Sequence, residues 1–192
     1  MTRLDVFEAI KTRRSISRFK PDPPPRELIE KILDAATWAP THHLTEPWRF
    51  FVLTGRAREK LGEVMAQALA EELADPNSQE SRVKIDGEKQ RPLRAPVIIA
   101  VAASPKQDPN VVELEEIVAT SAAIQNMLLA AHALGLGAIL RTGKAAYRKK
   151  VKEFFGLSDR DHLLGFIYLG YPDAQPQKGF RTPFQNKTVW LE

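Results

Sequence analysis

Apolar residues recur every three to four positions along much of the chain, the spacing that places them on one face of an α-helix. In the second such stretch Pro25 suits the first turn, and Pro40 ends the pattern. Helices are predicted over residues 3–13, 25–39, 56–74, 110–135 and 145–157.

Shorter apolar runs closed by glycine or proline lie between these stretches and have the length of strands. They cover residues 48–55, 95–103, 137–143 and 162–172. The run "PVIIAVAA" shows no alternation of apolar and polar residues, so a strand buried on both faces is expected there. Strands interleaved with helices, without an internal repeat, indicate a single α+β or α/β domain over residues 1–192.

Three segments leave their structure open. Residues 75–92 are polar and fit either a mobile loop or a short exposed helix. The second half of the 110–135 helix is rich in Ala and Leu, so it is expected to be buried nearly all round, as a core helix or at a subunit interface. The terminal "TVW" has strand character and would have to pair within its own sheet or with another chain.

Composition narrows the class of protein. The absence of cysteine excludes disulfides, thiolate metal sites and a cysteine nucleophile, and it suits a cytoplasmic protein. No apolar stretch reaches the ~20 residues that span a bilayer, so no membrane association is expected. The net charge of +4 is scattered along the chain, which argues against a nucleic-acid partner.

Common catalytic and cofactor motifs are missing from the sequence. The glycines of "GLGAIL" follow a helix and precede a strand, the reverse of the order in a dinucleotide-binding turn, so Gly135 is interpreted as a helix C-cap. His42 and His43 are adjacent, which makes a shared metal site improbable, and no metal is expected. No P-loop, HExxH or GxSxG motif is present.

A cationic segment remains, "RRSISRF", which contains Arg13, Arg14, Ser15, Ser17 and Arg18. Arginine forks with neighbouring hydroxyls can hold a phosphate. A cationic helix end that complements the helix dipole accounts equally for the composition, and by itself this segment favours that reading. The second cationic segment, "LRTG", is separated from it by more than a hundred residues, and composition alone does not join the two.

Four segments taken together resemble the nitroreductase family of FMN-dependent oxidoreductases, in its compact bacterial branch. They are "RRSISRF", "APTHHLTEPWRFFVL", "GLGAILRTG" and "FIYLGYP", in the family's order and at similar spacing. The resemblance implies an α+β homodimer with a mainly antiparallel central sheet flanked by helices, and a C-terminal tail exchanged onto the partner. It also implies non-covalent FMN at the dimer interface, reduced by NADH or NADPH and reoxidised by a small-molecule acceptor in a ping-pong mechanism.

The resemblance also assigns roles to residues. Arg13, Ser15 and the adjacent Arg14 would hold the phosphate and ribityl chain of FMN, with Ser17 nearby. A further segment of Leu140, Arg141 and Thr142 would meet the same cofactor. His42, with Trp38 near it, would reach FMN from the other subunit. No catalytic residue is assigned, because the flavin carries the chemistry.

This chain departs from the family pattern at three positions. Ser17 stands where many relatives have a basic residue near the flavin pyrimidine, and the cation moves to Arg18. Leu44 replaces the usual asparagine, and Glu46 replaces the glutamine before Pro47 and Trp48. The contacts at the pyrimidine end of the flavin are therefore expected to differ from those of its relatives.

The resulting hypothesis is an enzyme that uses NAD(P)H to reduce nitroaromatic, quinone or related acceptors through FMN. The alternative is a non-catalytic basic protein that binds a phosphorylated ligand or nucleic acid. The natural acceptor and the preference between NADH and NADPH are not encoded in any recognisable motif of the sequence.

Overall fold

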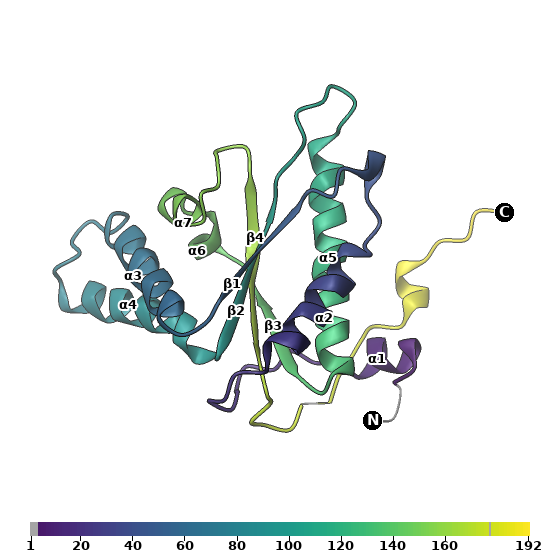
Figure 1. The fold of residues 1–192 in the computed structure, drawn as a ribbon, viewed down its shortest axis with the longest axis horizontal. Coiled ribbons are helices and arrows are strands. Elements are labelled where there is room, and N and C mark those ends of the chain that lie inside the picture. Colours follow the sequence, from purple (N-terminus) through teal and green to yellow (C-terminus); the bar gives the residue numbers. More distant parts are fainter. Residues whose placement is uncertain (1–3, 177) are drawn as a thin grey trace.

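A four-stranded antiparallel sheet lies at the centre of the computed structural model, which describes residues 4–176 and 178–192 (Figure 1). The strands are β1 (Trp48–Leu53), β2 (Val97–Ala103), β3 (Gly137–Arg141) and β4 (His162–Gly170), in the order β1-β2-β4-β3. Each neighbouring pair is antiparallel. The predicted α+β class with a mainly antiparallel sheet is confirmed.

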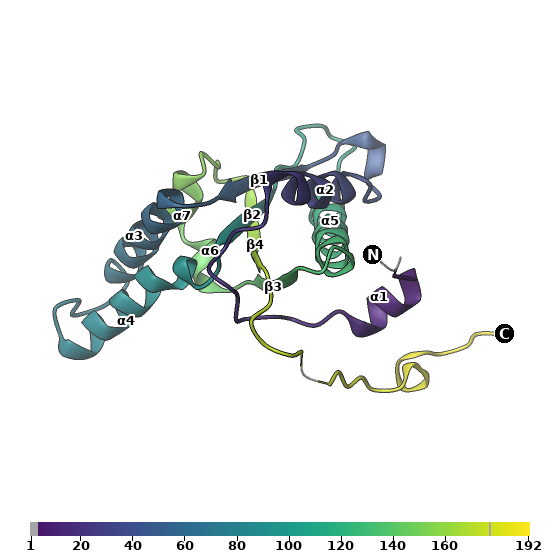
Figure 2. The ribbon, with the colours of Figure 1, turned by 60° about the horizontal axis from the view of Figure 1, so that its bottom comes forward.

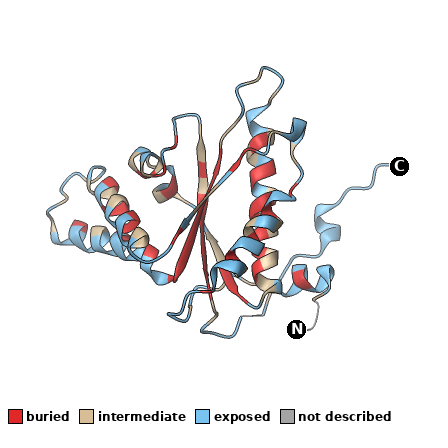
Figure 3. Ribbon diagram, in the orientation of Figure 1, coloured by how far each residue is buried: buried red, intermediate tan, exposed pale blue. Residues whose placement is uncertain are grey.

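Strand β2 forms the middle of the core, and every one of its residues is buried (Figure 3). Because side chains alternate across a strand, Val97, Ile99 and Val101 enter one apolar cluster. Ile98 and Ala100 enter a second cluster on the opposite face of the sheet. The expected strand buried on both faces is therefore present, and the sheet has a separate hydrophobic layer on each side.

Two helices, α2 (Arg26–Thr37) and α5 (Glu113–Ala133), cover the first face (Figures 1 and 2). Helix α5 ends where Gly135 adopts a φ of +76°, with the amide of Leu136 bonded to the carbonyl of Ala131 at 2.8 Å. This is the bond pattern of a helix capped by a left-handed residue, so the C-cap interpretation of Gly135 is confirmed.

The second face is covered by α3 (Arg56–Ala70), α6 (Lys144–Tyr147) and α7 (Lys149–Phe154). Helix α3 ends four residues before the predicted boundary at residue 74. Residues 75–92 include α4 (Gln79–Gln90), which packs against α3 and is followed by the 3-10 turn η2 (Arg91–Arg94). Of the two readings of this segment the helix is correct, although Ser81 and Glu88 are buried.

The single helix predicted over 145–157 is wrong, because the chain extends at Arg148 (φ −68°, ψ 133°) and divides it into α6 and α7. The Arg148 side chain is nearly buried, and its guanidinium bonds Glu72 at 2.9 Å and Glu88 at 3.1 Å. A buried guanidinium needs such partners. The ion pairs thus accompany a break that the local amphipathic pattern did not reveal.

Apolar side chains remain uncovered on the side of the molecule that carries α1 (Val6–Thr12) and the outer face of α5. Phe7 of α1 is 69% exposed, and Leu114, in the first turn of α5, is 67% exposed. In the second half of α5, where burial was expected, Ile124, Met127 and Leu128 are buried. The tail, with the 3-10 turn η3 (Phe184–Lys187), runs away from the body, and Trp190 is 78% exposed (Figure 2). Residues 188–190 form no strand with any described part of the chain.

Within the described ranges, no helix combines the length and apolar character needed to cross a membrane.

We expect Glu88→Ala to lower the free energy of unfolding by about 3 kcal/mol, because it removes one partner of a buried ion pair. This loss is at the low end of the range of about 3–5 kcal/mol for breaking a buried ion pair, because Arg148 keeps its second partner, Glu72. Urea unfolding measures the change. The control is Glu80→Ala, which removes the exposed pair of Glu80 with Lys84 and should leave the midpoint unchanged. Equal midpoints for the Glu88 variant and the wild type would contradict the structural role of the network.

Candidate functional site

The "RRSISRF" segment leaves the helix almost at once. Helix α1 ends at Thr12, Arg13 is its C-cap, and the following residues cross the beginning of β3 and the end of β4 in extended form. The amide of Ile16 donates to the carbonyl of Ala138 at 3.1 Å, and that of Lys20 donates to Tyr171 at 2.9 Å. The close approach requires Gly137, where an added methyl group would lie 2.9 Å from Cγ2 of Ile16.

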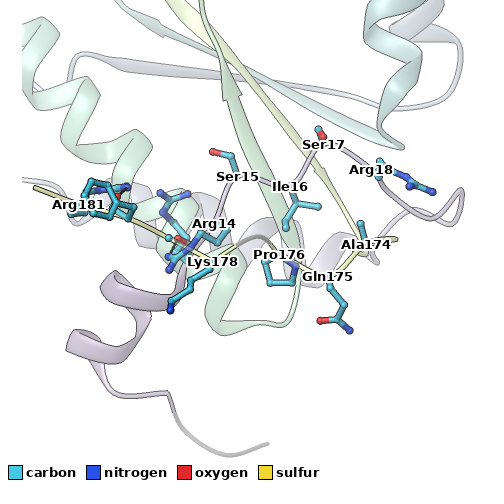
Figure 4. Close-up of a pocket in the computed structure, with 13 residues that line it drawn as sticks. Arg14, Ser15, Ile16, Ser17, Arg18, Ala174, Gln175, Pro176, Lys178 and Arg181 are labelled. Carbon is cyan, nitrogen blue, oxygen red and sulfur yellow. Dashed lines mark hydrogen bonds between the residues drawn. The ribbon is translucent and has the colours of Figure 1, made fainter.

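The segment forms one wall of a cavity of about 610 Å³, and the C-terminal tail forms the other (Figure 4). The two serines of the segment, Ser15 and Ser17, line it and are exposed. Figure 4 shows Arg14, Lys178 and Arg181 gathered on one side of the cavity and Arg18 on the other. Its cationic lining residues are Arg13, Arg14, Arg18, Lys178 and Arg181, and no acidic residue of the described chain lines it.

These cations lie close enough to disturb one another. Burial lowers the pKa of the Arg13 guanidinium, and the positive charges of Arg181 and Arg14 lower it further. Arg14 donates to the carbonyls of Lys11 at 2.7 Å and Arg13 at 2.8 Å, so it serves the helix-end role. Arg13 and Arg181 repel each other, and a bound anion would relieve that repulsion.

His132, near the end of α5, lies beside this cationic group. Its Nε2 is 2.8 Å from the hydroxyl of Thr12. Burial lowers the pKa of His132, and the charges of Arg13 and Arg14 add to that effect, while Glu8 opposes it. The neutral imidazole is therefore the favoured form next to the arginines.

The "THHLTEPW" segment forms a strained loop between α2 and β1. His43, Leu44 and Glu46 all have φ near +50°, a region that costs energy for residues other than glycine. The fully buried Glu116 holds the loop, accepting a hydrogen bond from the hydroxyl of Thr45 at 2.6 Å. This hydrogen bond connects the loop to helix α5.

The loop and the adjoining end of α2 present several predicted residues to solvent. Trp38, at the end of α2, is 81% exposed, and the His42 side chain lies 3.9 Å from the carboxylate of Glu115. Leu44 and Glu46, two of the departures from the family pattern, are also exposed. Trp48, in contrast, packs in the core.

The two predicted halves of the site lie at opposite ends of α5. His42 lies near Glu115, at the beginning of the helix, whereas Arg13 and Arg14, which line the 610 Å³ cavity, lie beside His132 near its end. Glu115 and His132 are 17 positions apart in α5, which corresponds to about 26 Å along the helix axis. One chain therefore does not bring Arg13 and His42 together.

The third predicted segment, at the end of β3, is divided between the two faces of the sheet. Leu140 packs against the α5 side. Arg141 and Thr142 line a separate cavity of about 220 Å³ with Arg91, Arg94 and Tyr168 on the α3 side. Their side chains do not line the cavity that contains Arg13.

Two cationic residues of the site, Lys178 and Arg181, were not among the predicted residues. The tail sequence "KGFR" carries both charges, but nothing local to it indicates which segment it will face. Their partner wall, residues 13–18, lies about 160 positions earlier in the chain. Within the described ranges, no three metal-ligating side chains gather into a possible metal site.

The family model "Nitroreductase family" matches residues 10–171, so this chain belongs to the nitroreductase family. The chain is 33% identical over 180 residues to "Putative NAD(P)H nitroreductase YdjA" of Escherichia coli strain K12, covering 94% of this chain and 95% of that protein. The family resemblance of the four sequence segments is therefore confirmed.

Solved structures agree with this assignment. A nitroreductase-like family protein from Bacillus cereus superposes with a TM-score of 0.85 at 30% identity. The superposition covers all of this chain and 98% of the Bacillus cereus chain. A relative from Desulfovibrio desulfuricans, solved in complex with FMN, superposes with a TM-score of 0.71 at 27% identity, covering 97% and 96% of the two chains.

The lowered pKa of His132 makes stability depend on pH. Near the ordinary histidine pKa of about 6.5, the unfolded chain binds more protons than the folded one, so stability falls as the pH drops through that region. We expect the wild type to lose more stability between pH 7.5 and 5 than His132→Gln does, as measured by urea unfolding at each pH. Parallel losses in the two proteins would exclude this origin.

Proposed function

We propose that the protein is an FMN-dependent oxidoreductase that uses NADH or NADPH to reduce a nitroaromatic, quinone or related acceptor. Family membership and a relative solved with FMN support the cofactor. The name of YdjA supports the nicotinamide donor. We also propose that residues 1–192 form one functional domain and that the protein acts in the cytoplasm.

The observation that carries the proposal is the group of mutually repelling cations around the 610 Å³ cavity. A terminal phosphate supplies the negative charge that offsets the repulsion between Arg13 and Arg181. The fork of a guanidinium group matches two phosphate oxygens. Ser15 stands beside them with an exposed side chain that can donate a further hydrogen bond. The residues present thus fit the phosphate end of FMN.

When bound, FMN supplies the redox chemistry, accepting hydride from the nicotinamide and passing electrons to the acceptor. Donor and acceptor would occupy the same place in turn, as a ping-pong mechanism requires. The chain contributes binding and position: Arg13, Arg181 and Ser15 at the phosphate, and the 140–142 segment farther along the cofactor. Ser17 cannot supply the positive charge that many relatives have near the flavin.

We propose that the active unit is a homodimer. In a twofold dimer that pairs α5 with its partner in opposite directions, the beginning of one helix meets the end of the other. His42 and Trp38 of one subunit would then approach the 610 Å³ cavity of the other subunit. Two half-sites that lie about 26 Å apart in one chain would thus meet across the interface. Exposed apolar side chains on α1, the outer face of α5 and the tail would be covered.

The purified protein is expected to show the visible absorption of oxidised flavin and to bleach with NADH or NADPH. We expect Arg13→Ala to weaken FMN binding by about tenfold to a hundredfold, because a charged hydrogen bond contributes about 1.5–3 kcal/mol. Fluorescence titration of FMN into the FMN-free protein measures the affinity.

The matched control is Arg82→Ala, which removes an exposed arginine of α4 on the other side of the sheet and should leave the affinity unchanged. A colourless protein that takes up no added FMN would overturn the enzyme assignment in favour of a non-catalytic basic binding protein. If the Arg13 variant binds FMN with wild-type affinity, Arg13 only caps the end of helix α1 and does not bind the phosphate.

The dimer is tested by sedimentation of the FMN-loaded protein and of a chain that ends at residue 182. We expect the shortened chain to dissociate at concentrations where the full chain is dimeric, because it lacks the exposed apolar side chains of Phe184 and Trp190. Val83→Ala, at an exposed apolar position on α4, serves as the control. A monomer that retains FMN would contradict a site shared between subunits.

A further inference from the structure

A second cationic cavity lies on the α3 side of the sheet, lined by residues outside the proposed phosphate site. Its volume is about 220 Å³, and its cations come from η2 and from the end of β3. The side chains of Phe166 and Tyr168, which belong to the apolar cluster on this face, line it together with Met65 and Ala146. The cavity therefore joins apolar surface to three guanidinium groups.

Two of these three arginines have no side-chain partner among the described residues. Arg91 is paired with Glu88 at 3.0 Å, and Glu88 is also bonded to Arg148. For Arg94 and Arg141, no side-chain hydrogen bond or ion pair is formed with any residue in the ranges 4–176 and 178–192. No acidic residue of those ranges lines the cavity. Its positive charge is thus only partly neutralised.

Tyr168 adds a neutral donor. It is only 7% exposed, and its hydroxyl makes no hydrogen bond with the described residues. Burial raises the pKa of Tyr168 above its ordinary value, and the charges of Arg141, Arg91 and Arg94 act against that rise. The phenol therefore stays protonated at neutral pH, and its hydroxyl is not among the enclosed, unpartnered polar atoms of the described residues, so it is accessible from the cavity that Tyr168 lines.

We propose that this cavity binds the oxyanion of a dissociable co-substrate, a phosphate or a carboxylate, between Arg94, Arg141 and the hydroxyl of Tyr168. Guanidinium groups and a phenol are donors that match oxyanion oxygens. The role as a co-substrate site rests on the proposed function. In that function the 140–142 segment meets FMN, so an anion beside Arg141 would lie next to the cofactor.

Anion binding itself is tested with inorganic phosphate, titrated by calorimetry at constant ionic strength into the full chain saturated with FMN. FMN occupies the first cavity, so the remaining binding reports the second. We expect saturable binding that weakens at least tenfold in Arg94→Gln and in Tyr168→Phe. Arg82→Gln, which removes the same charge from the exposed side of α4, should bind as the wild type does.

If the protein takes up no FMN, the titration is made without it, and phosphate binding that is lost in Arg94→Gln and Tyr168→Phe but kept in Arg13→Ala belongs to the second cavity. Failure of the proposed function and failure of this inference therefore remain distinguishable. Circular dichroism and urea unfolding show whether each variant is folded. Absence of saturable phosphate binding, or equal affinity in folded Arg94→Gln and wild type, would overturn the inference.

The source of the anion is identified by two matched pairs of substrates. NADPH differs from NADH by one phosphate, and 4-nitrobenzoate differs from nitrobenzene by one carboxylate. We expect Arg94→Gln to raise KM at least tenfold for the charged member of one pair, with kcat and the uncharged counterpart unchanged. A rise for NADPH identifies the donor, and a rise for 4-nitrobenzoate identifies the acceptor. Unchanged KM for both charged substrates would exclude a co-substrate role.

Discussion

Helix α5 runs for 21 residues along one face of the sheet, and a helix of that length is about 31 Å long. Its inner side supplies the core with Ala123, Met127 and Ala131, so it cannot bend or slide without opening that core. The rigid helix keeps the loop at His42 far from the arginine cavity at its other end. The uncovered outer side of α5 and the separation of the two half-sites both agree with the proposed homodimer, in which a second copy would cover the one and complete the other.

Unfavourable local interactions are concentrated around the proposed site. The arginines of the 13–18 segment and the tail repel one another, and three residues of the 41–46 loop have strained backbones. The rest of the fold supports these features: Glu116, fully buried, holds the loop through Thr45, and β3 holds the arginine segment through Ala138. Strained backbone and neighbouring like charges persist where the surrounding structure holds them in place, and such pre-organisation lowers the free-energy cost of binding an anion there.

Long, strongly patterned elements were predictable, whereas interactions between distant segments were not. The strand 97–103 was recognisable because a strand buried on both faces has no polar alternation. The break at Arg148 was missed because its cause, the carboxylates of Glu72 and Glu88, comes from other helices. Lys178 and Arg181 were missed for a similar reason, since their role depends on which wall the tail faces.

The sequence by itself determined the alternation of elements, the apolar strands and the four motifs that indicate a nitroreductase, because these depend on local spacing and order. Only the tertiary structure decided that Arg13 faces Arg181, that Arg141 faces Arg94 and Tyr168, and that His42 lies about 26 Å away along α5. The physical reason is the range of the forces involved. Periodicity records which face of an element is buried, whereas the meeting of charges from remote segments is set by how the whole chain packs.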